Sequence, residues 1–203
     1  MGWLDNLFGR GRGEPVIIVS GLPRSGTSMA MKMLDAAGIP AFQDGIRVAD
    51  EDNPRGYYEH ERVKDLDKRG ADRSWVREAR GKALKVISFL LPYLPGENDY
   101  RIVFMSRTME EVLASQAKML ERRNEDSETE DRRMTELYED HLQKVKNVIS
   151  VRDNMQMLEI HYSDVVTNSR READRIAEFL KLPPGTAERM AAQVDSQLYR
   201  NRA

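Results

Sequence analysis

Residues 15–28 read Pro15-Val-Ile-Ile-Val-Ser-Gly21-Leu-Pro-Arg24-Ser-Gly26-Thr27-Ser28. The apolar, β-branched run at the start of this stretch is typical of a buried strand. The Gly-x-x-x-x-Gly turn leads into an apolar pattern with helical spacing, which ends near Gly38. A strand, a glycine turn and a helix N-terminus together direct backbone N–H groups and the positive end of the helix dipole at one point. The stretch therefore predicts an anion site that suits a phosphate.

The basic residue of this loop lies in an unusual place. A Walker loop carries Lys directly after its second glycine, whereas this chain has Thr27 at that position. The cation of the loop is Arg24, two residues before Gly26. This placement weakens the alternative of a kinase or nucleotidase, and it leaves the predicted anion site intact.

Composition bounds the class of protein. The 203 residues predict an N-terminal arm over residues 1–14 and a single domain over residues 15–203. The 32 basic and 34 acidic residues give a formal net charge of −2, which does not indicate nucleic-acid binding. There is no cysteine, so disulfides, thiolate metal sites and a cysteine nucleophile are excluded. No metal is expected, because His60, His141 and His161 lack the spacing of metal ligands.

The sequence also bears on location. No apolar run approaches the roughly 20 residues of a membrane span, and the N-terminus lacks the long apolar core of a signal peptide. With 33% charged residues, the composition predicts a cytoplasmic protein. In the arm, Trp3, Leu4, Leu7 and Phe8 share one helical face, so a weak contact with a membrane or partner is the alternative to an arm packed on the body.

Apolar runs alternate with helical patterns along the rest of the chain. This alternation predicts βαβ units and a three-layer α/β/α fold around a central parallel sheet. Two capping boxes, Thr108–Glu111 and Ser169–Glu172, predict the starts of two helices. The long polar connection over residues 43–81 is of the kind that carries function. The predicted strands are Val16–Ser20, Ala83–Ser88, Arg101–Ser106 and Met157–Tyr162.

A second candidate anion site follows the strand that ends at Ser106. Arg107 comes directly after this strand, and ligands of open parallel sheets bind beyond the carboxyl ends of strands. We therefore expect Arg107 at the same edge as the glycine turn. Ser115 lies two turns into the next helix, and a guanidinium fork with a hydroxyl suits a second phosphate. The alternative is a surface arginine with a serine that packs between helices.

The two sites together resemble those of sulfotransferases that use 3′-phosphoadenosine-5′-phosphosulfate (PAPS), bacterial members included. Pro23-Arg24-Ser25-Gly26-Thr27-Ser28 resembles their 5′-phosphosulfate loop, and Arg107 to Ser115 resembles their 3′-phosphate motif, spacing included. The segment Leu158–Asp164 resembles a late strand of the family, in which a tyrosine, here Tyr162, sits near the adenine. The resemblance implies a P-loop NTPase-like sulfotransferase fold with PAPS as co-substrate. It also implies transfer of a sulfuryl group to a hydroxyl or amine, giving adenosine 3′,5′-bisphosphate (PAP).

The resemblance further implies catalytic residues. Arg24 resembles the basic residue that stabilises charge on the departing phosphate. Lys85 takes the place of the lysine in a Lys-x-His pair whose histidine is absent here, and a snorkelling surface lysine is the alternative. The acceptor needs a base for its proton. Asp44 is slightly favoured over Glu59 for this role, and His60 is third.

The acceptor itself is less well defined. The segment Asn53–Glu59 resembles a recurrent motif of bacterial sulfotransferases, with Arg55 able to hold an anion. Tyr57, Tyr58 and Trp75 could line a sugar or an aromatic ring, or they could belong to the core. We therefore expect a small-molecule or carbohydrate acceptor. Because the Lys-x-His histidine is missing, a nucleotide-binding protein without turnover is the alternative.

Overall fold

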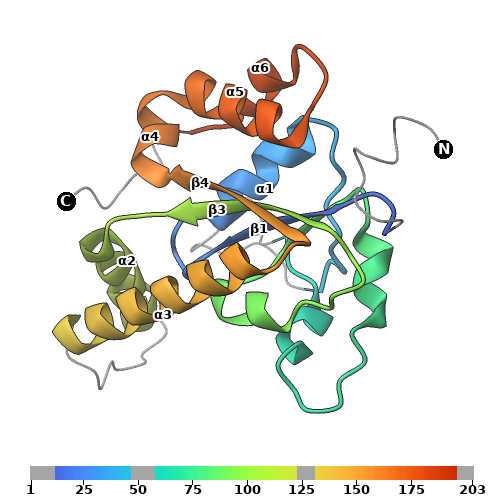
Figure 1. Cartoon of the computed structure of the whole chain (residues 1–203). Coiled ribbons are helices and arrows are strands. Elements are labelled where there is room, and N and C mark those ends of the chain that lie inside the picture. The colour runs from blue at the N-terminus through green and yellow to red at the C-terminus, as the bar shows by residue number, and fades with distance from the viewer. Residues whose placement is uncertain (1–11, 47–57, 123–130, 196–203) are drawn as a thin grey trace.

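The computed structural model describes residues 12–46, 58–122 and 131–195 (Figure 1). Most of the predicted N-terminal arm therefore lies outside the described residues. The described sheet has four strands in the order β2-β1-β3-β4, and every neighbouring pair is parallel. The strands are β1 (Val16–Gly21), β2 (Ala83–Lys85), β3 (Tyr100–Ser106) and β4 (Met155–His161).

The central strand β1 is buried along its whole length. Its side chains alternate between two apolar clusters, with Ile17 and Val19 in one and Val16 and Ile18 in the other. This alternation follows from the two-residue period of a strand. A parallel sheet covered on both faces requires such a continuous apolar run, which is why β1 was recognisable in the sequence.

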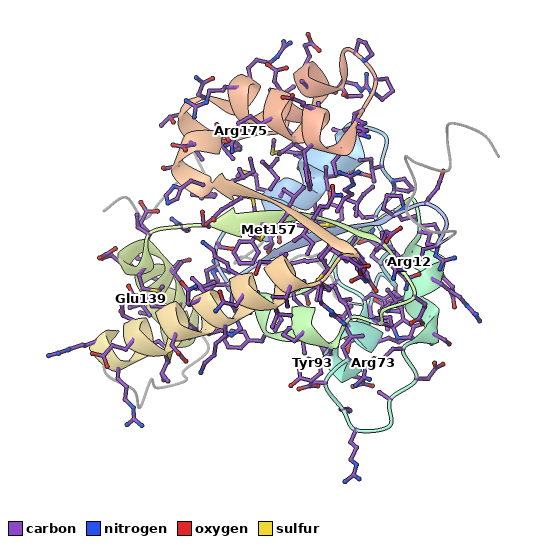
Figure 2. All side chains as sticks on the ribbon, in the orientation of Figure 1. Arg12, Arg73, Tyr93, Glu139, Met157 and Arg175 are labelled. Carbon is purple, nitrogen blue, oxygen red and sulfur yellow. The ribbon has the colours of Figure 1, made fainter. Side chains whose placement is uncertain are left out.

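Helices cover both faces of the sheet. In Figure 1, α5 and α6 lie on one side of the strands and α3 lies on the other. Figure 2 shows the side chains that fill the space between the sheet and α3, where Met157 of β4 packs against the core. The first layer contains α1 (Thr27–Ala36), α4 (Tyr162–Thr167), α5 (Ser169–Leu180) and α6 (Thr186–Ala191). The second contains α3 (Asp131–Val151) and the 3-10 helices η2 (Glu61–Asp65), η3 (Ser74–Ala79) and η4 (Ser88–Tyr93).

These layers confirm the predicted three-layer α/β/α fold with a parallel sheet. The remaining helix, α2 (Met109–Arg122), follows the carboxyl end of β3. The loops after β1 and β3 therefore meet at one edge of the sheet, as expected for an open parallel sheet.

Each strand differs from its predicted range by one to three residues at one or both ends, and one helix start differs by one residue. The second strand ends at Lys85 rather than Ser88, because the chain turns into η4 at Ser88. The capping box predicted at Ser169 is wrong by one residue. Asn168 is the N-cap of α5, and its side chain accepts a hydrogen bond of 3.3 Å from the Arg171 N–H. Asparagine is as good an N-cap as serine, so it takes the position.

No helix within the described ranges is long and apolar enough to cross a membrane.

Candidate functional site

The loop between β1 and α1 needs glycine at both ends. Gly21 has φ +149 and Gly26 has φ +100, values that other residues rarely adopt. A side chain at Gly21 would meet the Met105 carbonyl and the Ser25 hydroxyl, and one at Gly26 would meet the Tyr162 ring. Gly26 offers no side-chain cap to α1, and the first turn of α1 contains no acidic residue. The positive end of the helix dipole is thus not offset by a local carboxylate, which suits an anion.

The same loop contains a buried hydroxyl that lacks a protein partner. Ser25 is 1% exposed, and its Oγ makes no hydrogen bond within the described part of the chain. Leaving such a group unsatisfied costs about 1–3 kcal/mol. A phosphate oxygen at this loop would satisfy it, so the loop fits the predicted 5′-phosphosulfate group. Pro23 lies exposed at the turn, and Thr27 and Ser28 are the first residues of α1.

The structure brings the two predicted phosphate motifs together. Arg24, with φ +69, donates from Nε to Ser115 Oγ at 3.0 Å across 91 residues of sequence. Arg107 donates from its guanidinium to the Arg24 carbonyl at 3.2 Å. Because Arg24 belongs to the first motif and Ser115 to the second, these contacts join the two candidate anion sites at one edge of the sheet.

Contacts with Glu111, Arg24 and Tyr162 hold Arg107 in place. Its Nε donates to Glu111 Oε2 at 2.7 Å, its guanidinium contacts Arg24, and its Cζ lies 4.4 Å from the centroid of the Tyr162 ring. The side chains of Arg107 and Glu111 are only 7% and 4% exposed. Burial raises the pKa of Tyr162, with Arg107 opposing that shift, so the tyrosine is a neutral platform for the guanidinium. Sequence reasoning missed Glu111, although its i,i+4 spacing from Arg107 was a usable signal.

Lys85 lies beside the same loop. Pairing of β2 with β1 places Lys85 opposite Val19, two residues before the end of β1. Its Nζ lies 3.2 Å from Ser28 Oγ and 3.2 Å from Glu59 Oε1. The Lys85 side chain is 9% exposed, so it is not the snorkelling surface lysine that was the alternative. Lys85 thereby connects the start of α1 to a carboxylate.

Asp44 and His60 lie beside the start of η2. Asp44 accepts from the Glu61 N–H at 2.6 Å and from the Ile46 N–H at 3.0 Å. These two hydrogen bonds, the one from Glu61 first, lower the pKa of Asp44. His60 Nδ1 accepts from the Arg62 N–H at 3.3 Å and so caps η2. Both side chains therefore stabilise the local backbone.

The aromatic residues predicted near an acceptor have different places. Trp75 is 2% exposed and stacks on His60 with 5.1 Å between ring centroids, so it belongs to the core. Tyr58 packs against the apolar cluster on the α1 face. Arg55 and Tyr57 lie outside the described residues. In the part of the chain that the structure describes, no group of three or more His, Cys, Asp or Glu residues could hold a metal ion.

Comparison with known proteins assigns the family. A model of the sulfotransferase domain matches residues 14–202. The chain belongs to the sulfotransferase domain family. This match confirms the resemblance inferred from the two phosphate motifs, together with the sulfotransferase activity and fold that it implied. No curated protein matches the sequence.

Solved structures agree on the fold of this sulfotransferase. A mouse sulfotransferase complexed with PAP superposes with a TM-score of 0.56 at 17% identity, covering 97% of this chain and 70% of that one. A sulfotransferase from Mycobacterium tuberculosis gives 0.55 at 14% identity, with 89% and 71% covered. The sulfotransferase domain from the curacin biosynthetic pathway gives 0.54 at 14% identity, with 93% and 87% covered. At such identities the likeness establishes the fold alone.

Proposed function

We propose that this sulfotransferase moves a sulfuryl group from PAPS to a hydroxyl group of a small-molecule acceptor. The observation that carries the proposal is the hydrogen bond of 3.0 Å between Arg24 and Ser115, which joins the two phosphate motifs. A donor with phosphates at both ends of its ribose fits two joined anion sites. The fold shared with a sulfotransferase complexed with PAP supports the same donor.

Each anion site has its own part in binding. The glycine loop, with Arg24, Ser25 and the N-terminus of α1, holds the 5′-phosphosulfate end. Arg107 and Ser115 hold the 3′-phosphate, which PAPS carries and ATP lacks. Loss of one charge-assisted hydrogen bond is worth about 1.5–3 kcal/mol, or roughly a ten- to hundredfold change in affinity. The second site therefore gives PAPS a higher affinity than ATP.

PAPS supplies the sulfuryl group, and the side chains of this chain stabilise the developing negative charge and take up the acceptor proton. Arg24 stabilises the charge that develops on the departing phosphate, and Lys85 stabilises charge on the sulfuryl oxygens. Glu59, in contact with Lys85, is the proposed base for the acceptor proton. The backbone hydrogen bonds that lower the pKa of Asp44 also weaken it as a base, which supports Glu59 over Asp44.

Calorimetric titration with PAP and with ATP·Mg tests the donor. We expect the wild-type chain to prefer PAP, and Ser115→Ala and Arg107→Lys to lose about ten- to a hundredfold in PAP affinity. Arg170→Ala, which removes an exposed arginine of α5, is the matched control and should bind PAP as the wild type does. A preference for ATP·Mg, as a kinase or nucleotidase would show, contradicts the proposal. So does indifference of PAP binding to Ser115 and Arg107.

Transfer from radiolabelled PAPS to an acceptor panel tests the base. Glu59→Gln should lower kcat by about 10²–10⁴ without changing PAP affinity. Glu61→Gln, two residues along and partly exposed, is the control, because within the described residues the Glu61 carboxylate accepts hydrogen bonds from the side chain of Lys64 alone. Loss of transfer in Asp44→Asn with full activity in Glu59→Gln would assign the base to Asp44 instead. Tight PAP binding with no transfer to any acceptor would favour a nucleotide-binding protein without turnover.

A cytoplasmic location and a bacterial origin are further parts of the proposal. The absence of cysteine and the high content of charged residues support the location. The likeness of the loop and of the segment Asn53–Glu59 to bacterial motifs supports the origin. A weak contact through the N-terminal arm stays a prediction, because the arm lies mostly outside the described residues.

A further inference from the structure

Three aromatic rings form a nearly parallel stack next to Glu59, the proposed base. The rings of Phe42 and His60 have 4.9 Å between centroids and an interplanar angle of 6°. The rings of His60 and Trp75 have 5.1 Å between centroids and an angle of 13°. Trp75 is 2% exposed, and the His60 side chain is 14% exposed. We call Phe42, His60 and Trp75 the ring stack.

Both partners of His60 are attached to the body of the domain. Phe42 donates from its backbone N–H to the Ala83 carbonyl of β2 at 2.8 Å, and Ala41 forms a parallel bridge with Ala83. Trp75 belongs to η3 and packs in the apolar cluster on the α3 face of the sheet. Stacked aromatic rings stabilise each other beyond the burial of their area. The ring stack therefore fixes residue 60 relative to β2.

The residue before His60 contacts the same strand from the other side. Glu59 Oε1 lies 3.2 Å from Lys85 Nζ, which itself lies 3.2 Å from Ser28 Oγ of α1. His60 has extended backbone, with φ −128 and ψ 121, so neighbouring side chains leave the chain there in opposite directions. Lys85 follows Ala83 by two residues in β2. One short strand thus carries both the attachment of the ring stack and the partner of Glu59.

The polar contacts of His60 serve the backbone around it. Its Nδ1 accepts from the Arg62 N–H at 3.3 Å, so this nitrogen is occupied. The same Nδ1 lies 3.7 Å from Asp44 Oδ2, and the Asp44 N–H donates to the Glu59 carbonyl at 3.4 Å. His60, the third candidate for the base, therefore holds the segment that carries Glu59.

We propose that His60 is a positioning residue for sulfuryl transfer, which holds the Glu59 carboxylate against Lys85 through the ring stack. The inference rests on the proposed function and adds the residues that orient its base. A base acts only within hydrogen-bond reach of the proton that it takes. The Glu59 side chain is 23% exposed, so contact with Lys85 and a fixed backbone restrict its orientation. A misplacement of about 1 Å can cost about a hundredfold in rate.

Kinetics of transfer from radiolabelled PAPS test the role of the His60 ring. His60→Ala should lower kcat about ten- to a hundredfold, because Glu59 loses its position. His60→Phe keeps a flat ring and cannot take up a proton, so it should restore kcat to within about threefold of the wild type. His60→Asn keeps a cap for the Arg62 N–H without a ring, and it should be as slow as His60→Ala. PAP affinity should be the same in all three variants.

His141→Ala is the matched control. His141 also stacks on an aromatic ring, with 3.7 Å between its centroid and that of Phe89, and its Nε2 lies 2.9 Å from Ser88 Oγ. It belongs to α3, which covers the opposite face of the sheet from α1 and Ser28. His141→Ala should therefore lower the Tm, as loss of a stacked histidine does, and leave kcat unchanged.

A double-mutant cycle identifies the group through which His60 acts. In the Glu59→Gln background, His60→Ala should lower kcat by less than about twofold, because the carboxylate that it positions is already absent. A purely structural effect of His60 would persist in that background and would overturn the inference. Equal kcat in His60→Ala and the wild type would also overturn it, and so would a His60→Phe variant as slow as His60→Ala.

Failures of the inference and of the proposed function are distinguishable. Full activity in Glu59→Gln would overturn this inference and leave the PAPS donor as proposed. If the wild type turns over no acceptor, carbon NMR of the PAP-bound chain decides, with the Glu59 carboxyl resonance assigned through Glu59→Gln. That resonance should move in His60→Ala but not in His60→Phe or His141→Ala, and an unmoved resonance overturns the inference alone. Failure of the wild-type chain to bind PAP overturns the proposed function and this inference together.

Discussion

Replacing Glu111 by glutamine tests the role of Arg107 most directly. The pair has 2.7 Å between Arg107 Nε and Glu111 Oε2, and both side chains are almost fully buried. Glutamine keeps the shape of the side chain and removes its charge, so Arg107 loses the buried carboxylate of Glu111. Breaking a buried pair in this way costs about 3–5 kcal/mol. Because Arg107 keeps the Arg24 carbonyl and the Tyr162 ring, we expect about 3 kcal/mol, the lower end of that range.

This loss is measurable by thermal unfolding. For a chain of this size, 1 kcal/mol shifts Tm by about 2–4 °C, so Glu111→Gln should unfold about 6–12 °C below the wild type in the absence of ligand. A bound 3′-phosphate supplies the negative charge that the variant lacks. PAP should therefore bind the variant more tightly than the wild type, by about tenfold, and should restore part of the lost Tm.

Glu110→Gln is the matched control, since Glu110 is the exposed neighbour on the same helical turn. It should leave both the Tm and the PAP affinity as they are in the wild type. The reasoning is refuted if Glu111→Gln has the same Tm as the wild type, or if its PAP affinity, measured by calorimetry, falls instead of rising. An unchanged Tm would mean that the buried pair with Glu111 adds no net stability, and a lower PAP affinity would mean that Arg107 does not face the 3′-phosphate.

Three further predictions concern the glycine loop, Asp44 and His141. Gly26→Ala introduces a methyl group at positive φ against the Tyr162 ring, so calorimetry should show a loss of PAP affinity, and unchanged affinity would contradict the loop geometry. The pKa of Asp44 is lowered, so the stability that Asp44 contributes is fully present at pH values above its ordinary pKa of 3.8 and is lost as the pH falls below that value. Asp44→Asn should therefore reduce the difference in urea midpoint between pH 6 and pH 3. Burial lowers the pKa of His141 below its ordinary 6.5, so the unfolded chain takes up the proton first and stability falls as pH drops below 6.5. His141→Gln should reduce the change in urea midpoint between pH 7.5 and pH 5.5. If the midpoint of the variant changes with pH as much as that of the wild type, groups other than His141 cause the loss of stability.

The sequence was most informative where the signal is local. The strand β1, the glycine turn and the start of α1 follow from burial, backbone conformation and helix geometry within one short stretch. Arg107 was placed at the correct edge because the carboxyl ends of parallel strands meet there. The contacts of Lys85 with Ser28 and Glu59 could not be predicted, because they depend on the register of β2 against β1 and on the path of the chain near residue 59.

The contacts of Asp44, one of the two candidate bases, show the same limit. Its carboxylate accepts from a backbone N–H that lies 17 residues along the chain, a contact that no spacing rule reveals. The predicted start of α5 was wrong by one residue, for a local reason. Asn168 and Ser169 are both good N-caps, so a local rule finds the helix start only to within one residue.

Under the proposed function, the hydrogen bond between Arg24 and Ser115 makes the two candidate anion sites parts of one bivalent receptor. A ligand with a single phosphate binds one part only, and this one contact must offset the whole loss of translational and rotational entropy on association. A donor with both phosphates binds the second part intramolecularly, at the high effective concentration set by its own ribose. Neither site then needs to be strong. Discrimination comes from the spacing between them, so free phosphate and nucleotides that lack the 3′-phosphate compete poorly even when they are abundant.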